Sequence, residues 1–163
     1  GHAYGFLLHD LDRNSVMTRE AVRLLPGSGA CWIFHAISLV YCGQFSQAVR
    51  AADTAVKLCR GTMAQPLTRS TELFARLMAG DTLGAIRAGE ASLDSVVFRP
   101  TIVDLMIAYA AEGRLEEGRS KLLLLVEKEP DLSIDMLKSA SYPIVNPSHR
   151  KRVVAAATQL GLR

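Results

Sequence analysis

The sequence predicts an all-α fold in which pairs of helices repeat along the chain. A stretch of thirteen residues without a charged side chain, 30–42, ends at Gly43. The segment that follows places Ala48, Ala52 and Ala55 on one helical face, so two helices that meet at a tight turn are expected. Glycines head similar segments at intervals of 37 and 33 residues, and a mean period of 35 residues is typical of stacked helix hairpins.

Three short motifs mark this period. Gly43 begins G-Q-F-x-x-A, Gly80 begins G-D-T-x-x-A and Gly113 begins G-R-L-x-x-G. Pro26 and Pro130, each expected to close a second helix, lie 104 residues apart, which is three periods of nearly 35. Since one hairpin cannot bury its apolar faces alone, the copies predict a stacked array.

The N-terminal residues 1–26 are interpreted as the end of an earlier hairpin. An apolar run at 3–8 and a polar turn at 9–13 precede a helix at 14–25, which ends against Pro26. The first helix of this hairpin is incomplete, so we expect the chain to be a piece of a longer protein.

Three complete hairpins are expected next. Their helices span 30–42 and 45–58, 66–79 and 83–93, and 101–112 and 115–128. Ser28 or Gly29 can cap the first of these helices. Gly84 and Gly89 are weak helix formers inside a predicted helix, which indicates that neighbouring helices approach closely there.

Residues 131–163 break the period. Asp131 or Ser133 can cap a short helix that ends at the turn 142–143, and a second, basic helix spans 148–160. A different and more polar pattern at the end of an array is typical of a terminal cap.

The stretch 32–58 resembles a tetratricopeptide (TPR) unit, and the stretch 102–130 resembles a second one. The matching residues are Trp32, Leu39, Gly43, Phe45, Ala48, Ala55 and Leu58 in the first, and Tyr109, Gly113, Leu115 and Pro130 in the second. Arg60 stands where the family usually has proline, and Gly118 where it usually has alanine. The resemblance implies a TPR-like right-handed solenoid with a C-terminal pair of capping helices.

On this basis the chain divides into TPR-like repeats at 1–130 and capping helices at 131–163. The repeats comprise a partial unit at 1–26 and units at 30–60, 66–95 and 100–130.

The C-terminal segment is similar to the TPR regions of bacterial class III adenylate cyclases and winged-helix transcriptional regulators. This similarity rests on Asn146, Pro147, Arg150, Val153, Ala156, Leu160, Gly161 and Leu162. In such proteins the array follows a catalytic or DNA-binding domain, which this chain does not contain. The resemblance therefore implies a non-catalytic, protein-binding regulatory module of a bacterial signalling or transcription regulator.

Composition narrows the possible functions. A chain of 163 residues with 49% hydrophobic content can bury a sizeable core, and a formal net charge of +3 is too small to indicate a nucleic-acid partner. No apolar run reaches the roughly 20 residues that cross a bilayer, so we expect a cytoplasmic chain without membrane contact. The three cysteines are odd in number and lack C-x-x-C spacing, so we expect buried, reduced thiols.

No pattern typical of a catalytic, cofactor-binding or metal site occurs in the sequence, so we expect neither an enzyme nor a cofactor. The segment 27–29 has glycines but lacks the lysine of a phosphate-binding loop, and the histidines are scattered. His35 lies in an apolar helix and is expected to be hydrogen-bonded in a core, with ligand contact as the alternative.

In TPR arrays the first helix of each hairpin lines a concave groove that binds peptides. The resemblance therefore implies nine apolar groove residues: Ile33, Ile37, Val40, Tyr41, Phe74, Leu77, Met78, Val103 and Ile107. Two interpretations are open. In one, the groove is exposed and binds a protein or peptide, such as an apolar helix, a second copy of the chain, or the N-terminal domain of the longer protein. In the other, a short array closes on itself and these residues form its core.

The alternative partner is nucleic acid, bound through the basic run Arg150, Lys151 and Arg152. Positive charge at the start of a helix opposes the helix dipole, so the run contributes little to helix stability. No aromatic residues interleave with it, which favours a solvated basic face over a nucleic-acid site.

Overall fold

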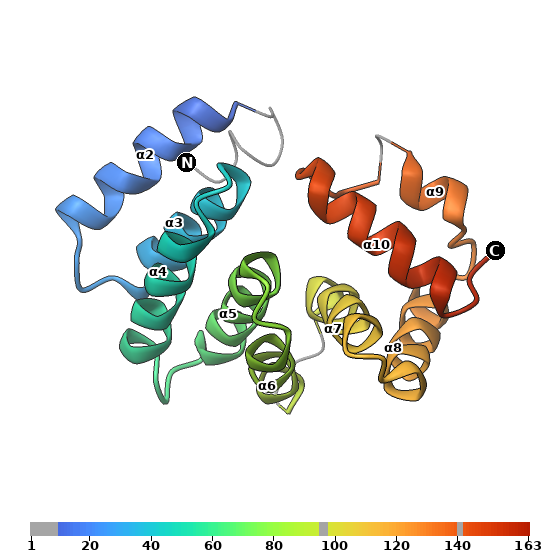
Figure 1. Cartoon of the computed structure of the whole chain (residues 1–163). Helices are drawn as coiled ribbons and strands as arrows, with labels where there is room; N and C mark the ends of the chain where they lie inside the picture. Colours follow the sequence, from blue (N-terminus) through green and yellow to red (C-terminus); the bar gives the residue numbers. More distant parts are fainter. Residues whose placement is uncertain (1–9, 95–97, 140–141) are drawn as a thin grey trace.

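The structure is a computed structural model that describes residues 10–94, 98–139 and 142–163. Over these residues the chain is all-α, with nine helices and no strand, as predicted. The helices are α2 (Leu11–Leu24), α3 (Gly29–Tyr41), α4 (Phe45–Leu58), α5 (Gln65–Ala79), α6 (Thr82–Leu93), α7 (Arg99–Ala111), α8 (Leu115–Lys128), α9 (Ile134–Lys138) and α10 (Pro147–Gln159). Figure 1 shows them following one another along an arc, and from α2 to α8 each helix packs against the next.

Most helix boundaries agree closely with the sequence, and α4 and α8 have the predicted bounds to the residue. The polar turn predicted at 9–13 is wrong for residues 11–13, which form the first turn of α2. The Asp10 side chain accepts a hydrogen bond from the Arg13 amide at 3.0 Å, which caps the helix earlier than expected. The apolar run at 3–8 lies outside the described residues.

The three repeat glycines form equivalent turns between helices. Gly43, Gly80 and Gly113 have φ angles of 72°, 89° and 70°, a left-handed conformation that strains a residue with a side chain. In each turn the amide after the glycine bonds the carbonyl five residues before it, at 2.8, 2.9 and 3.0 Å. This pattern satisfies carbonyls at the helix end, so the predicted turn positions are confirmed.

The two glycines inside α6 have different surroundings. A Cβ atom on Gly89 would lie 2.6 Å from Leu105 Cδ2 and 3.0 Å from Leu73 Cδ2, so α6 approaches α7 and α5 closely there, as predicted. At Gly84 the nearest atoms belong to the cap of α6 itself. Its nearest neighbour is the carboxylate of Asp81, which caps α6 by accepting a hydrogen bond from the Gly84 amide at 2.9 Å.

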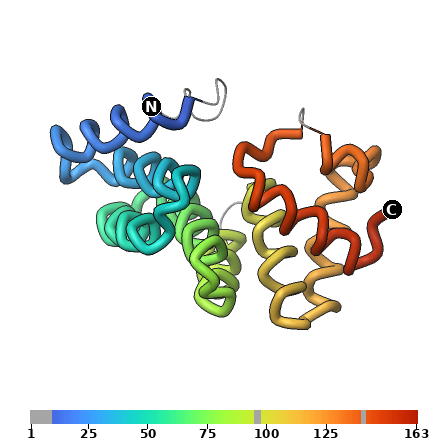
Figure 2. The backbone as a smooth tube through the Cα atoms, turned by 45° about the horizontal axis from the view of Figure 1, so that its top comes forward, coloured from blue at the N-terminus to red at the C-terminus, as the bar shows by residue number. Residues whose placement is uncertain are grey.

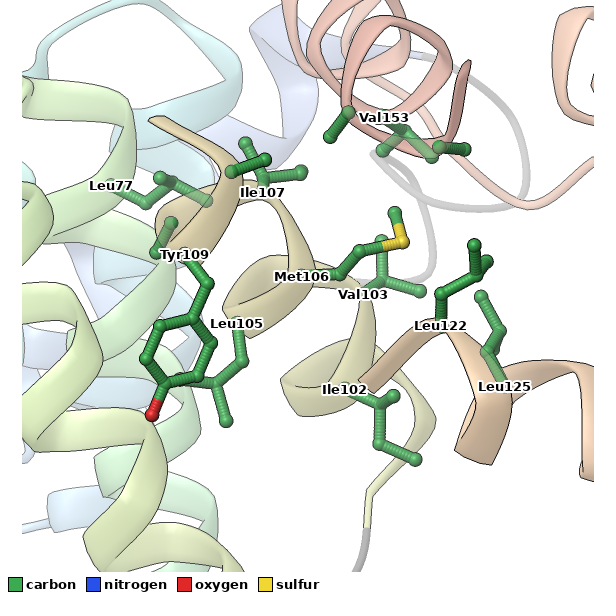
Figure 3. Close-up of a cluster of buried hydrophobic side chains, with 14 of the residues drawn as sticks. Leu77, Ile102, Val103, Leu105, Met106, Ile107, Tyr109, Leu122, Leu125 and Val153 are labelled. Carbon is green, nitrogen blue, oxygen red and sulfur yellow. The ribbon is translucent and has the colours of Figure 1, made fainter. Parts of the chain in front are cut away.

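Among the described residues there are two hydrophobic clusters, and the larger is centred on α7. Every residue from 101 to 110 is buried, and Figure 3 shows α7 side chains among those of α5, α8 and α10. Ile107 of α7 and Val153 of α10 belong to this cluster, and Figure 3 labels both. A smaller cluster joins α3, α4 and α5.

The C-terminal helix α10 turns back onto α7, which Figure 2 shows from a second direction. The Arg150 guanidinium donates to four backbone carbonyls between residues 137 and 144, which fixes the turn that precedes α10. Arg152 donates to the carbonyl of Leu77 in the last turn of α5, at 2.7 Å. The basic run therefore attaches the end of the chain to the rest of the array.

Two further details concern this terminal segment. Ser133, one of the two predicted caps, caps α9, but the helix ends at Lys138 and not at the predicted turn 142–143. A Cβ atom on Gly118 of α8 would lie 2.9 Å from Leu160 Cδ2, so the absence of a side chain there makes room for the end of the chain. None of the described helices combines the length and apolar character needed to cross a bilayer.

Candidate functional site

A pocket of about 330 Å³ lies between helices of the N-terminal half and the C-terminal segment. Its walls come from α3, α5, the start of α7, and the segment that leads into α10. The lining residues are Ile33, Phe34, Ile37 and Tyr41 from α3, Leu67, Ser70, Thr71 and Phe74 from α5, Pro100 and Asp104 from α7, and Pro143, Ile144, Val145, Asn146 and His149 from the terminal segment. The pocket thus joins residues that are more than 100 positions apart in the sequence.

The walls are mainly apolar and remain in contact with solvent. Phe34 is 38% exposed and Leu67 is 39% exposed, whereas Ile33 is 2% exposed. A volume near 330 Å³ lies at the lower end of the range found for ligand pockets in proteins. The pocket is therefore large enough for one bulky side chain or a small molecule.

A buried polar pair lies inside this apolar surface. His149 Nε2 lies 2.6 Å from Asp104 Oδ1, and the two side chains are 12% and 3% exposed. Asn146 places His149 by capping α10, since its side-chain oxygen accepts a hydrogen bond from the His149 amide at 3.0 Å. Asp104 lies in the middle of the buried helix α7, so the pair links α7 to the first turn of α10.

Aromatic rings adjoin the pair. The Phe74 ring centroid is 5.0 Å from that of His149 and 6.4 Å from that of Tyr41. Burial, and after it the negative charge of Asp104, together raise the pKa of Tyr41 to about 12. The Tyr41 hydroxyl is therefore protonated at neutral pH and available as a hydrogen-bond donor or acceptor.

The nine predicted groove residues divide into two groups. Ile33, Ile37, Tyr41 and Phe74 line the pocket. The other five are core residues, namely Val40 and Met78 in the smaller cluster, and Leu77, Val103 and Ile107 in the larger one. The predicted groove residues therefore separate by location: α10 packs on α7, whereas residues of α3 and α5 line the pocket.

The residues predicted for nucleic-acid binding have different surroundings. Arg150 and Arg152 donate to backbone carbonyls of the chain itself, and Lys151 is exposed. His35 is half-buried with its Nδ1 atom 3.3 Å from the Thr18 hydroxyl, so its predicted hydrogen bond is confirmed. Burial lowers the pKa of His35.

The cysteines are unpaired. Cys59 is buried as predicted, whereas Cys31 and Cys42 are half-buried. Over the described ranges, no cluster of three or more potential metal ligands occurs.

Sequence reasoning missed the pair formed by Asp104 and His149 and the pocket wall at 143–146. A signal for Asp104 was present, because it is a lone carboxylate in an otherwise uncharged stretch, 101–111. A buried carboxylate requires a partner, but the sequence does not indicate which of the distant basic residues provides it.

Comparisons with protein-family models, with curated proteins and with solved structures return no match for this chain. The TPR resemblance therefore stays a prediction, and functional inference rests on the pocket itself.

Proposed function

We propose that this chain is a non-catalytic protein-interaction module with a TPR-like, right-handed solenoid architecture, which binds a segment of a partner protein in the pocket between α3, α5 and the α10 segment. The equivalent turns at Gly43, Gly80 and Gly113, spaced near the TPR period, support the architecture. The regulatory role within a longer bacterial protein comes from the sequence resemblance alone.

The observation that carries the binding proposal is an open, mainly apolar pocket with a buried polar pair. When a partner covers apolar surface that was in contact with water, the free energy of the complex falls by about 25 cal/mol per Å². An inserted side chain removes water from Phe34, Leu67 and Phe74 together, so the pocket favours an anchor with a long apolar part.

Self-association through the same face is the competing form of this proposal. Light scattering on a size-exclusion column across a concentration series separates the two. A monomer is expected, whereas a stable dimer that dissociates on mutation of the pocket would replace the partner segment by a second copy.

We do not propose nucleic-acid binding, because two residues of the basic run already donate to carbonyls within the chain. A labelled DNA duplex at low salt tests this choice directly. We expect no mobility shift. A shift that Lys151→Ala weakens would contradict this choice.

The binding proposal is tested by peptide display against the whole chain. Peptides selected on the wild-type protein are then measured against Phe34→Glu, which alters the pocket, and Leu83→Glu, which alters a more exposed apolar residue of α6 outside it. We expect Phe34→Glu to weaken binding at least about tenfold and Leu83→Glu to leave it unchanged. Equal binding to both variants would overturn the proposal.

A further inference from the structure

The charged residues that line the pocket determine the sign of its net charge. Asp104 is its single acidic residue, His149 is its one basic residue, and none of the described residues that line it is a lysine or an arginine. His149 Nε2 is already engaged by Asp104 at 2.6 Å. With a neutral imidazole the pocket carries one negative charge, and with an imidazolium the pair is neutral. In neither state does the pocket carry the net positive charge that an anion requires.

Aromatic faces add to this preference. Phe34, Tyr41 and Phe74 all line the pocket, and the negative face of an aromatic ring attracts a cation. The Tyr41 hydroxyl makes no hydrogen bond to another residue in the part of the chain that the structure describes, so its oxygen is available as an acceptor. A carboxylate and a phenol oxygen therefore adjoin aromatic and aliphatic walls.

The geometry points to a lysine side chain of the partner segment as the occupant of this pocket, with its methylene stem against Ile37, Phe74 and Ile144 and its ammonium group at Asp104 and Tyr41. This inference rests on the proposed function, because it names the side chain that the partner segment inserts. The four-carbon stem of lysine buries readily against apolar surface while its head carries the charge.

Lysine fits this site better than arginine does. A guanidinium group binds best to both oxygens of a carboxylate at once. Asp104 Oδ1 is occupied by His149, which leaves no free pair of oxygens. The compact ammonium group requires separate acceptors around one point, and Asp104 and the Tyr41 hydroxyl can provide them.

The first test uses three probes with one apolar body and different heads: 4-phenylbutylamine, 4-phenylbutan-1-ol and 4-phenylbutyrate. Each is titrated into the whole chain at pH 7.5 and followed by backbone amide NMR shifts. We expect the amine to bind at least about tenfold more tightly than the alcohol, and the carboxylate to bind most weakly. Equal affinity of amine and alcohol, or tightest binding of the carboxylate, would overturn the lysine inference and leave the proposed function standing. If none of the three probes binds, the proposed function fails, and the inference fails with it.

Variants test whether Asp104 and Tyr41 cause the preference for the amine. Asp104→Asn is expected to remove the tenfold advantage of the amine while the alcohol, which serves as the control for an intact pocket, binds as before. Asp135→Asn makes the same chemical change at a side chain that is 96% exposed and outside the pocket, and it is expected to change neither affinity. If Asp104→Asn does not fold, Tyr41→Phe replaces it in the test. This variant is expected to lower the affinity for the amine severalfold and to leave the affinity for the alcohol unchanged.

The last arm identifies the source of the ammonium group. In display-selected peptides, replacement of the anchoring lysine by norleucine keeps the stem and removes the charge. A loss of about tenfold is expected. Selected peptides that bind in the pocket without any lysine would overturn the assignment of the occupant even if the free amine binds.

Discussion

Substitution of Gly89 by alanine tests how closely α6 packs against α7. Two effects of opposite sign compete. Alanine stabilises a helix interior by about 1 kcal/mol relative to glycine. The added methyl would lie 2.6 Å from Leu105 Cδ2 and 3.0 Å from Leu73 Cδ2, and both leucines are fully buried, so neither can move without disturbing other contacts.

Overpacking of this kind costs about 1–3 kcal/mol. Because two buried side chains are involved, we place the cost in the upper half of that range and expect Gly89→Ala to lower the free energy of unfolding by about 1–2 kcal/mol. Urea unfolding followed by far-UV circular dichroism measures the change.

The Leu105→Ala background isolates the steric cause. It removes the atoms nearest to the new methyl, so the helix-propensity gain is expected to dominate and Gly89→Ala to stabilise that background by up to about 1 kcal/mol. The same loss in both backgrounds, or a gain in the wild-type chain, would refute the close packing of α6 on α7.

Three further predictions concern the cap, a turn and pH dependence. Arg152→Met removes the hydrogen bond to the Leu77 carbonyl and is expected to cost about 1–2 kcal/mol in thermal or urea unfolding, whereas the exposed neighbour, in Lys151→Met, changes stability by less than about 0.5 kcal/mol. Gly113→Ala places a side chain at a φ of 70° and is expected to cost about 1–2 kcal/mol, while Gly27→Ala, with no neighbour within 4 Å of a new Cβ, has little effect in the same assay. The folded-state pKa of Tyr41 is raised to about 12, above its unfolded value of about 10, so the stability that Tyr41 contributes is complete below pH 10 and is lost as the pH rises through 12. Tyrosinate absorbance checks this, because Tyr41→Phe is expected to remove a transition near pH 12; loss of one near pH 10 instead would contradict the burial of Tyr41.

The turns were predictable because their causes are local. A glycine at Gly43, Gly80 or Gly113 is required by the left-handed backbone of that residue, and the bonds that close each turn join residues five positions apart. The nearest contact of Gly84, with the cap residue Asp81, is local too. Both the close approach of another helix and the carboxylate of a helix cap favour the absence of a side chain, and the sequence alone does not separate them.

The division of the groove residues was not predictable. In α3, Ile33, Ile37 and Tyr41 recur at a spacing of four and line the pocket, while Ala36 and Val40 recur at the same spacing and enter the core. Both stripes of the helix are apolar. Helical periodicity therefore identifies two apolar faces, but it does not indicate which one a neighbouring helix covers.

The position of α10 decides that question, and it connects stability to binding. The helix covers Val103 and Ile107, which completes the core, and the segment before it supplies the wall opposite α3 and α5. The same Arg150 contacts that fix this segment therefore shape the pocket. A bound partner segment would contact α3, α5 and residues 143–149 at once. By linkage, it would stabilise the packing of the C-terminal segment against the rest of the chain by the same free energy that this packing contributes to binding. Loss of the cap would expose core surface and remove the pocket together, so binding through this pocket requires the C-terminal segment even though the repeats supply most of its lining.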